Sequence, residues 1–378
     1  MTLFFIAMIL IIIVPDLYIF ISLIAGHTAT AWAVAWWLPT VVIMSLLLSM
    51  AGKYSLKRLR LFFLLFAGIS VPKLAFALFY GIGQLLGFLQ AGIIAGLVGV
   101  ALILVAAIYG ITLGWRRLKV DRRDLYYADL PQAYDGLRIV QFSDFHLGSY
   151  REGEPFVTHV VDTILAQQPH LVLFTGDLVN VDPREALPFT QQLKRIKAPL
   201  GVYSVSGNHD YNGSFQAIVD YERNTLGWNM LLNESRAIAP PAGGTTDTPI
   251  YLVGVENTSV HTFVSRGRLH DAMAHVPGGA FTILMTHDPN HWRHEVLPTT
   301  TVQLTLSGHT HAGQLKIGNW SPVQYNYREW GGLYNDAQHG LGGDGTRRLL
   351  VSLGLGGTNR FRLGATPEIN LITLHRKS

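Results

Sequence analysis

Five apolar runs in the second part of the chain each end in a short polar segment that contains Asp, Asn or His. The segments are Ser143-Asp144-Phe145-His146, Thr175-Gly176-Asp177, Gly207-Asn208-His209-Asp210, Thr286-His287-Asp288 and Gly308-His309-Thr310-His311. In open α/β sheets ligands bind at the carboxyl ends of the strands, so residues that are far apart in the sequence converge there. We therefore expect one site that is built from all five segments.

The residue types in these segments are typical of a site for divalent transition-metal ions. Asp144 and His146 are two residues apart, as are His309 and His311. In an extended backbone this spacing directs both side chains to one side. Carboxylates combined with imidazoles favour Mn, Fe or Zn over Ca or Mg, which prefer oxygen ligands. Asp177 follows a glycine that permits a sharp turn, and its two oxygens suit a bridge between two ions.

The neighbouring Asn208 and His209 have different expected roles. Asn208 offers a neutral carbonyl oxygen as a ligand, and His209 then points elsewhere and is free to act on the substrate. The pattern D-x-H, G-D, G-N-H-D, H and G-H-x-H resembles that of the calcineurin-like metallophosphoesterase superfamily over about residues 137–375, and is closest to its membrane-associated bacterial branch. The resemblance implies a four-layer α/β sandwich, in which two β-sheets lie between helices.

The resemblance also implies hydrolysis of a phosphate ester with the help of two divalent metal ions. The two sets of ligands share one carboxylate: Asp144, His146, Asp177 and His311 for one ion, and Asp177, Asn208, His287 and His309 for the other. His209 resembles the catalytic histidine that donates a proton or hydrogen bond at the phosphoryl group, and Asp210 resembles the acid that orients it. Arg362 falls near a family arginine, which implies a contact with a phosphate or headgroup; the alternative is a surface ion pair with Glu368.

The composition differs sharply between two parts of the 378-residue chain. Residues 1–115 contain five of the 29 Lys and Arg residues and one of the 25 Asp and Glu residues, so the net charge of +4 belongs to this first part. A formally neutral second part has no excess of cations for a nucleic-acid backbone, and we expect no nucleic-acid partner. The sequence contains no cysteine, which excludes disulfides, thiolate ligands and a cysteine nucleophile.

The first part contains four apolar stretches, each close to the roughly 20 residues that a helix needs to cross a bilayer. They span about residues 3–25, 29–50, 60–82 and 87–114. We predict an all-α transmembrane bundle of four helices over residues 1–115. A linker and lead-in strand follow at 116–136, and the α/β metallophosphoesterase domain occupies 137–378. The alternation of short β-rich runs with helix-like segments in this last region is typical of a layered α/β domain.

The positions of Lys and Arg predict the orientation of these helices. Basic residues lie between the second and third helices and after the fourth: Lys53, Lys57, Arg58, Arg60, Arg116, Arg117, Lys119, Arg122 and Arg123. The other two connections contain none. Positively charged loops stay in the cytoplasm, so we predict a multi-pass protein of the cell (inner) membrane with its catalytic domain in the cytoplasm.

Two charges, Asp16 and Lys73, lie inside the apolar stretches. Each follows a proline in a similar local sequence, so we expect them to reach a similar depth and to neutralise each other. The interpretation that we favour is a structural ion pair; an ion or lipid path between the helices is the alternative. Gly92 and Gly96 form a G-x-x-x-G step, which predicts close packing of helices.

Three functions are consistent with this sequence. The first is hydrolysis of a phosphate ester or pyrophosphate of a lipid or lipid-linked substrate, because only about 20 residues separate the fourth helix from the first catalytic strand. The second is a phosphodiesterase for a soluble, nucleotide-type substrate, with the helices as an anchor. The third is a membrane sensor or transporter with a regulatory phosphoesterase-like domain, which the complete ligand set and the sparse intramembrane charge disfavour.

Overall fold

The computed structural model divides the chain into two compact units, Met1–Thr112 and Leu113–Ser378. It describes residues 2–50, 55–242, 248–259, 264–338 and 340–377. Lys53, one of the basic residues used to predict the orientation, lies outside the described residues.

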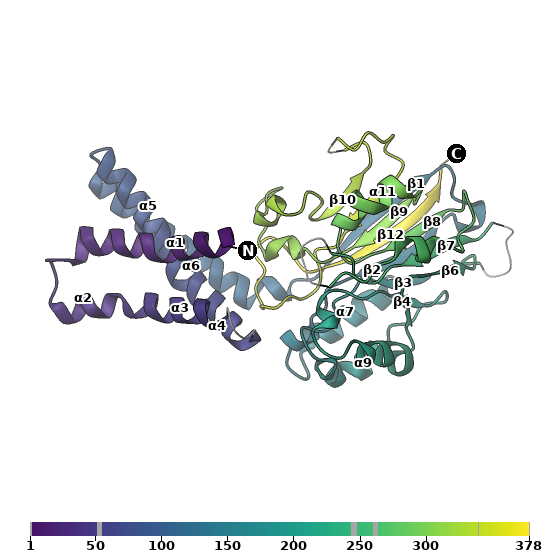
Figure 1. Ribbon diagram of the computed structural model, residues 1–378, viewed down its shortest axis with the longest axis horizontal. Helices are drawn as coiled ribbons and strands as arrows, with labels where there is room; N and C mark the ends of the chain where they lie inside the picture. The colour runs from purple at the N-terminus through teal and green to yellow at the C-terminus, as the bar shows by residue number, and fades with distance from the viewer. Residues whose placement is uncertain (1, 51–54, 243–247, 260–263, 339, 378) are drawn as a thin grey trace. The chain divides into compact units, whose positions relative to one another are not determined.

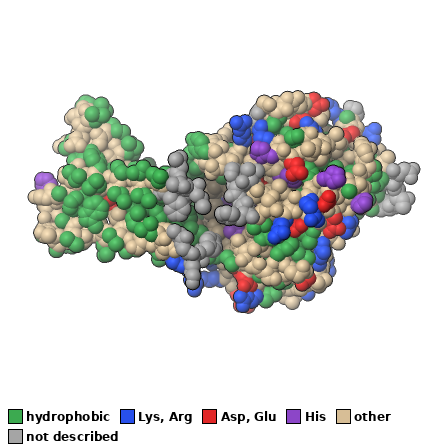
Figure 2. Space-filling model, viewed as in Figure 1, with side chains coloured by type: hydrophobic (Ala, Val, Ile, Leu, Met, Phe, Trp, Pro, Cys, Tyr) green, Lys and Arg blue, Asp and Glu red, His purple; other side chains and the backbone are tan. Residues whose placement is uncertain are grey.

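The first unit consists of helices. These are α1 (Thr2–Ile19), α2 (Thr30–Trp36), α3 (Leu38–Ser49), α4 (Leu56–Leu65), α5 (Val71–Leu85) and α6 (Leu89–Thr112). With the π-helical turns that follow α1 and α4, they form four segments that are long and apolar enough to cross a membrane: Ile6–Ile24, Thr30–Ser49, Leu56–Leu85 and Leu89–Arg116. The prediction of four long apolar helices is confirmed. Figure 2 shows hydrophobic side chains over most of the visible surface of this unit.

Glycines allow α5 and α6 to approach each other closely. A Cβ atom on Gly92 would lie 2.8 Å from the Cα atom of Gly83, and one on Gly96 would lie 2.8 Å from the ring of Phe76. Both distances are too short for a side chain, so the backbones of the two helices pack directly at Gly92, and the ring of Phe76 packs onto the backbone at Gly96. The predicted packing role of Gly92 and Gly96 is confirmed.

The two intramembrane charges lie against each other. Lys73 Nζ is 2.7 Å from Asp16 Oδ1, and Asp16 is buried. Thr40 on α3 donates a hydrogen bond to the second oxygen of Asp16, and Lys73 Nζ also lies 4.1 Å from the ring centre of Trp36. The predicted ion pair is therefore present, and it joins α1, α3 and α5.

The second unit contains two six-stranded mixed sheets. The first has the order β1-β12-β2-β3-β4-β5 and the second the order β10-β11-β9-β8-β7-β6. The strands are β1 (Lys119–Tyr127), β2 (Leu137–Phe142), β3 (Leu171–Phe174), β4 (Val202–Ser204), β5 (Asn229–Met230), β6 (Glu234–Ile238), β7 (Ile250–Gly254), β8 (Thr282–Met285), β9 (Leu304–Ser307), β10 (Gly332–Asn335), β11 (Arg348–Val351) and β12 (Glu368–Arg376). Strands β2, β3 and β4 run parallel in the first sheet, as do β8 and β9 in the second.

Alternate side chains of the central strands enter different cores, which explains why these strands are apolar throughout. Leu137 and Ile139 of β2 face the core shared by the two sheets, whereas Val140 and Phe142 face the core beneath the helices. In the second sheet, Leu284 likewise packs away from its two neighbours in β8. A strand that is covered on both faces needs apolar residues at every position.

Helices cover the outer faces of both sheets. They are α7 (Pro155–Ala166), α8 (Thr190–Leu193), α9 (Phe215–Asp220), α10 (Leu269–Met273) and α11 (Leu297–Thr299). Helices α7, α8 and α9 pack on the first sheet and α10 on the second, which gives the layers helix, sheet, sheet and helix (Figure 1). The predicted four-layer α/β sandwich is confirmed. The loops after β2, β3, β4, β8 and β9 then meet where the parallel strands of both sheets end.

Candidate metal centre

Two hydrogen bonds hold the ends of the two sheets together at the site. The buried side chain of Gln141 in β2 donates from Nε2 to the backbone oxygen of Ser307 in β9, over 2.9 Å. His287 Nδ1, after β8, lies 2.7 Å from the backbone oxygen of Thr175, after β3. Since a carbonyl can only accept, His287 donates from Nδ1 and directs Nε2 into the site. The five polar segments are thereby fixed to one place.

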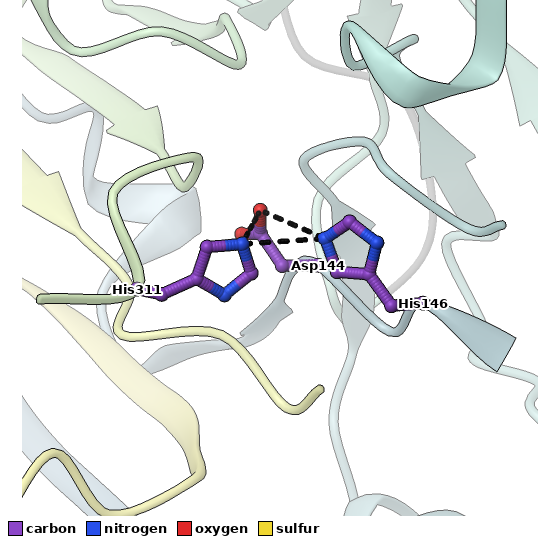
Figure 3. Close-up of side chains that lie close together, drawn as sticks. All are labelled: Asp144, His146 and His311. Atoms are coloured by element: carbon purple, nitrogen blue, oxygen red, sulfur yellow. Dashed lines mark hydrogen bonds and ion pairs between the residues drawn. The ribbon is translucent and has the colours of Figure 1, made fainter. Parts of the chain in front are cut away.

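Asp144, His146 and His311 form the first group of potential ligands (Figure 3). Their side chains point toward one another, with His311 Nε2 3.4 Å from Asp144 Oδ1 and 3.2 Å from His146 Nε2. His146 Nε2 and Asp144 Oδ1 are 4.0 Å apart. All three ligand atoms lie within 4.8 Å of one another, a spacing that one metal ion can satisfy.

Asp177, His287 and His309 form the second group. His287 Nε2 lies 3.2 Å from Asp177 Oδ2 and 3.2 Å from His309 Nδ1. The same oxygen of Asp177 is 3.5 Å from His146 Nε2 in the first group. Asp177 therefore faces both groups, as a shared carboxylate must, while its other oxygen accepts a hydrogen bond from the backbone N–H of His209.

The donor set fits divalent cations. Asn208 Oδ1 is buried and has no hydrogen-bond partner among the described residues, which is costly unless another ligand satisfies it. The two groups combine carboxylates with imidazoles, the chemistry that selects Mn, Fe or Zn, and no Lys or Arg of the described residues pairs with Asp144 or Asp177. Each of the residues expected as metal ligands thus lies at the site or beside it.

The backbone of this site is strained in the way that functional sites often are. Left-handed φ angles occur at Asp144 (53°), His146 (51°), Asp177 (61°), His309 (73°) and His311 (50°). Non-glycine residues rarely adopt this region, and each such residue costs stability. Our expectation that an extended backbone directs Asp144 and His146 to one side was therefore wrong in its geometry: sharp turns after the strands do so.

Glycines next to the ligands are required by close packing between loops. A Cβ atom on Gly207 would lie 2.2 Å from Asp177 Oδ1, and one on Gly308 would lie 1.9 Å from Ser143 Oγ and 2.3 Å from Asp144 Oδ2. Any side chain at either position would displace a ligand carboxylate. This packing accounts for the glycines in the G-N-H-D and G-H-x-H segments.

Burial sets the protonation of most groups in the centre. It lowers the pKa of His146 to about 3 and that of His309 to about 4, which leaves neutral imidazoles that can bind a metal. Burial also raises the pKa of Asp144 to about 6. Burial alone would lower the pKa of His287, but the adjacent carboxylate of Asp177 raises it to about 10. In the absence of a cation, a proton on His287 balances the charge of Asp177.

His209 lies at the edge of the centre. One of its ring nitrogens is within 4.8 Å of ligand atoms of His146 and Asp177. Nδ1 is 2.8 Å from the backbone oxygen of Asn180, so Nδ1 donates and Nε2 is the nitrogen that can reach a substrate. The expectation that Asp210 orients this ring was wrong. The buried carboxylate of Asp210 instead accepts hydrogen bonds from three backbone N–H groups, those of Asp177, Leu178 and Gly207.

Neither of the two expectations for Arg362 fits its position. The side chain is buried, with 1% exposed, so it is not a surface ion pair with Glu368. Its guanidinium donates to the backbone oxygens of Leu353, Ala365 and Gly356, and NH2 lies 3.4 Å from His311 Nδ1. These contacts engage both terminal nitrogens, and Nε is buried without a hydrogen-bond partner among the described residues. Arg362 thus supports the loop behind His311 and does not face a substrate in this structure.

Tyr327 is a residue of the site that the sequence did not reveal. Its hydroxyl lies 2.8 Å from His309 Nε2, while Asp288 Oδ2 is 3.9 Å from the same nitrogen. A hydrogen bond on the far nitrogen fixes the orientation of a histidine ligand. Tyr327 is 18 residues beyond His309 and belongs to no motif, so no signal in one sequence could identify it.

Comparison with known proteins agrees with this geometry. Residues 137–313 match the model of the calcineurin-like phosphoesterase family. Over 253 residues the chain is 30% identical to the metallophosphoesterase YkuE of Bacillus subtilis strain 168, and the alignment covers 65% of this chain and 81% of the relative. The chain belongs to the calcineurin-like phosphoesterase family. The phosphoesterase unit is that of a hydrolase of phosphate esters, and the family generally uses divalent metal ions.

Two further relatives are metallophosphoesterases, and one of them is named as a transmembrane protein. This chain is 28% identical over 219 residues to a transmembrane protein with metallophosphoesterase domain of Danio rerio, and the alignment covers 56% of this chain and 48% of the relative. A metallophosphoesterase of Helicobacter pylori strain J99 is 28% identical over 208 residues, covering 53% of this chain and 51% of the relative. The chain thus spans about half the length of these two relatives. Together with the four apolar helices, the name of the Danio rerio relative suggests a membrane protein.

Proposed function

We propose that this chain is a membrane-anchored phosphoesterase with a centre of two divalent metal ions. The observation that carries the proposal is the single oxygen of Asp177, which lies 3.5 Å from His146 Nε2 and 3.2 Å from His287 Nε2, between two groups of ligand atoms. Asp144, His146, Asp177 and His311 would hold one ion, and Asp177, Asn208, His287 and His309 would hold the other. Bound ions of this kind supply Lewis acidity toward water and phosphoryl oxygens.

The residues of the chain divide the remaining work. His209 presents Nε2 to the substrate, where it donates a proton or hydrogen bond to the leaving oxygen, and the carbonyl of Asn180 holds its ring. Asp210 fixes the loop of Asp177 against the loop of Asn208 through three backbone N–H groups. Tyr327 and Arg362 support His309 and His311 from behind. These roles keep the reacting groups in place, which orientation effects require.

The substrate in this proposal is a phosphate ester or pyrophosphate of a lipid or lipid-linked molecule. In this proposal the chain crosses the cell (inner) membrane four times, and the positions of its basic residues support a cytoplasmic phosphoesterase unit. In the chain, only strand β1 and two short 3-10 helices lie between α6 and the first catalytic strand β2. This short connection in the sequence supports a substrate that belongs to the membrane.

A metal titration of the full-length protein in detergent tests this function. The metal-free protein, prepared with a chelator, is titrated with Mn²⁺, Fe²⁺ or Zn²⁺. Bound metal is measured together with the hydrolysis of phenyl phosphate, of dispersed lipid phosphates and of nucleotides. We expect activity to appear as bound metal approaches two ions per chain. Activity in the absence of bound metal contradicts the proposed centre. Hydrolysis of nucleotides alone contradicts the lipid substrate and leaves the two-metal centre in place.

A further inference from the structure

A pocket lies in the segment that follows His309 and His311, two of the expected metal ligands. It has a volume of about 850 Å³, and its walls include Lys316, Tyr325, Arg328, Trp330 and Tyr334. We refer to it as the 316–338 pocket, after the range of residues that line it. None of the residues discussed as ligands or catalytic groups is part of its lining. The proposed mechanism therefore leaves this pocket without a role.

Hydrogen bonds fix the walls of this pocket to the loop that carries His309 and His311. The hydroxyl of Tyr327 lies 2.8 Å from His309 Nε2, and Thr310 Oγ1 donates to the backbone oxygen of Trp330 over 2.6 Å. Lys316 follows His311 by five residues in the chain. The segment that lines the pocket is therefore bonded directly to the loop that carries two of the expected metal ligands.

Two cationic side chains of the pocket have no counter-charge. Within the described residues, neither Lys316 nor Arg328 has a hydrogen-bond or ion-pair partner for its side chain, whereas the adjacent Glu329 is paired with Arg293. Unpaired cations at the wall of a pocket favour an anion there, and a guanidinium binds a carboxylate or phosphate through two parallel hydrogen bonds. A neutral or cationic ligand would leave this charge uncompensated.

The other walls suit a flat group with polar substituents. Tyr325 is 77% exposed and can stack on a ligand, and Tyr334 and the edge of the largely buried Trp330 complete the aromatic wall. Asn319 and Gln324 offer amide groups to hydroxyls or carbonyls. A small number of polar groups on an aromatic wall is typical of pockets for small molecules.

We propose that the 316–338 pocket binds the leaving group of the substrate and that this group carries a second anionic function, a phosphate or a carboxylate. The inference rests on the proposed function, since it concerns the substrate of the same site. A lipid headgroup with two phosphates and a soluble organic phosphate with a second anion share this chemistry.

The test compares matched probes that differ by one distal anion. Phenylphosphonate and 4-carboxyphenylphosphonate, which resist hydrolysis, are titrated calorimetrically into the full-length protein in detergent with Mn²⁺ present. Phenyl phosphate and 4-carboxyphenyl phosphate are used for hydrolysis. We expect the carboxylated member of each pair to be preferred about tenfold, the effect of one good charge-assisted contact. The double variant Lys316→Gln/Arg328→Gln is expected to lose this preference while its kcat/KM for phenyl phosphate stays the same.

A control variant removes two positive charges at positions outside the pocket. Lys194→Gln/Lys197→Gln changes two exposed lysines that do not line the pocket, and it should keep the preference of the wild type.

Phosphatidic acid and phosphatidylglycerol phosphate in mixed micelles form a lipid pair. A preference in this pair alone identifies a lipid headgroup as the source, and one in the aryl pair alone identifies a soluble substrate.

Two failures can be told apart. If the wild type binds both phosphonates equally, and the Lys316→Gln/Arg328→Gln variant behaves identically, the subsite is contradicted even when phenyl phosphate is hydrolysed. If metal is bound and neither aryl phosphate nor lipid is hydrolysed, the proposed function is contradicted, while the two phosphonates still report on the pocket through binding.

Discussion

In the helical unit Asp16 and Lys73 lie 2.7 Å apart and cancel each other's charge, with Thr40 as a further donor. In the phosphoesterase unit Asp144 and Asp177 are buried beside imidazoles whose nitrogens converge on them, and no Lys or Arg pairs with either carboxylate among the described residues. The helical unit thus neutralises its buried carboxylate with a lysine of its own. The phosphoesterase unit instead leaves its buried carboxylates available to a bound metal ion.

This difference distinguishes a charged pair that only stabilises the fold from a group of residues that binds a ligand. A buried ion pair that is satisfied by its own neighbours can be explained by the cost of charge in an apolar medium. Buried carboxylates and imidazoles that face one another, with Asn208 Oδ1 unsatisfied beside them, cannot be explained in this way. The predictions below alter the charge of one region at a time.

The largest effect is expected for Asp177→Asn. The amide keeps an oxygen that can accept from the N–H of His209, so the unit should fold, but it lacks the charge and the second acceptor that serve both ions. We expect hydrolysis to fall by more than the roughly 10–100-fold that changes behind a ligand cause, and bound metal to fall below two ions per chain. Metal analysis and hydrolysis of phenyl phosphate measure both.

A matched variant controls for the loss of a carboxylate as such. Asp344→Asn alters an exposed acid whose only described partner is Thr346, and it should keep full activity and metal content. Full turnover by Asp177→Asn with two bound ions would contradict the shared carboxylate.

A smaller loss is expected for His209→Ala. The ring of His209 is held by the carbonyl of Asn180 at the edge of the centre, so its removal should leave both ions in place. We expect a decrease in kcat of about 10²–10⁴-fold, the usual contribution of an acid–base group, and a greater decrease for esters with poor leaving groups. A loss of metal equal to the loss of rate would instead assign His209 to the ligands.

The parts of the molecule that could be predicted from sequence are those with a local signal. The four apolar helices follow from composition, and the convergence of Asp144, Asp177 and His287 follows from the position of each after an apolar strand. Burial on both faces makes these strands uniformly apolar, so their ends stand out. The pairing of Asp16 with Lys73 was also predictable, because an isolated charge in an apolar bundle needs a partner.

The errors concern contacts between segments that no spacing encodes. Asp210 is next to His209 in the sequence, but its carboxylate faces the backbone of Asp177 and Leu178, because it lies beneath the loop rather than beside the imidazole. Arg362 matches a family position, yet it is buried behind His311, and its two terminal nitrogens donate to backbone oxygens. Such directions depend on left-handed turns and close glycine contacts, which are properties of the folded loops.

A moderate effect on stability, with no effect on chemistry, is expected from the helical unit. Lys73→Met leaves Asp16 without its counter-charge, and we expect a loss of about 2–3 kcal/mol in the free energy of unfolding. The double variant Asp16→Asn/Lys73→Met removes both charges and should recover most of this loss. Unfolding of the full-length protein in mixed micelles by a denaturing detergent measures both, with the exposed Lys57→Met as control. Equal losses in the single and double variants would contradict a self-compensated pair.

A pH-dependent effect is expected from the buried acid Glu222, which has no ion-pair partner among the described residues. Burial raises the pKa of Glu222 from 4.5 to about 8, and Ser204 donates a hydrogen bond to its carboxyl group. The folded protein therefore retains a proton that the unfolded chain releases, so stability due to this group is complete below pH 4.5 and is lost as the pH rises toward 8. Glu222→Gln should remove this loss. We expect the stability of the wild type, relative to this variant, to decrease by about 1 kcal/mol per pH unit, or about 3 kcal/mol between pH 5 and pH 8. Thermal unfolding at both pH values measures the difference, and the exposed Glu152→Gln should follow the wild type. Parallel pH profiles of the wild type and Glu222→Gln would show instead that Glu222 is ionised in the folded unit, and that a buried carboxylate there needs no cation.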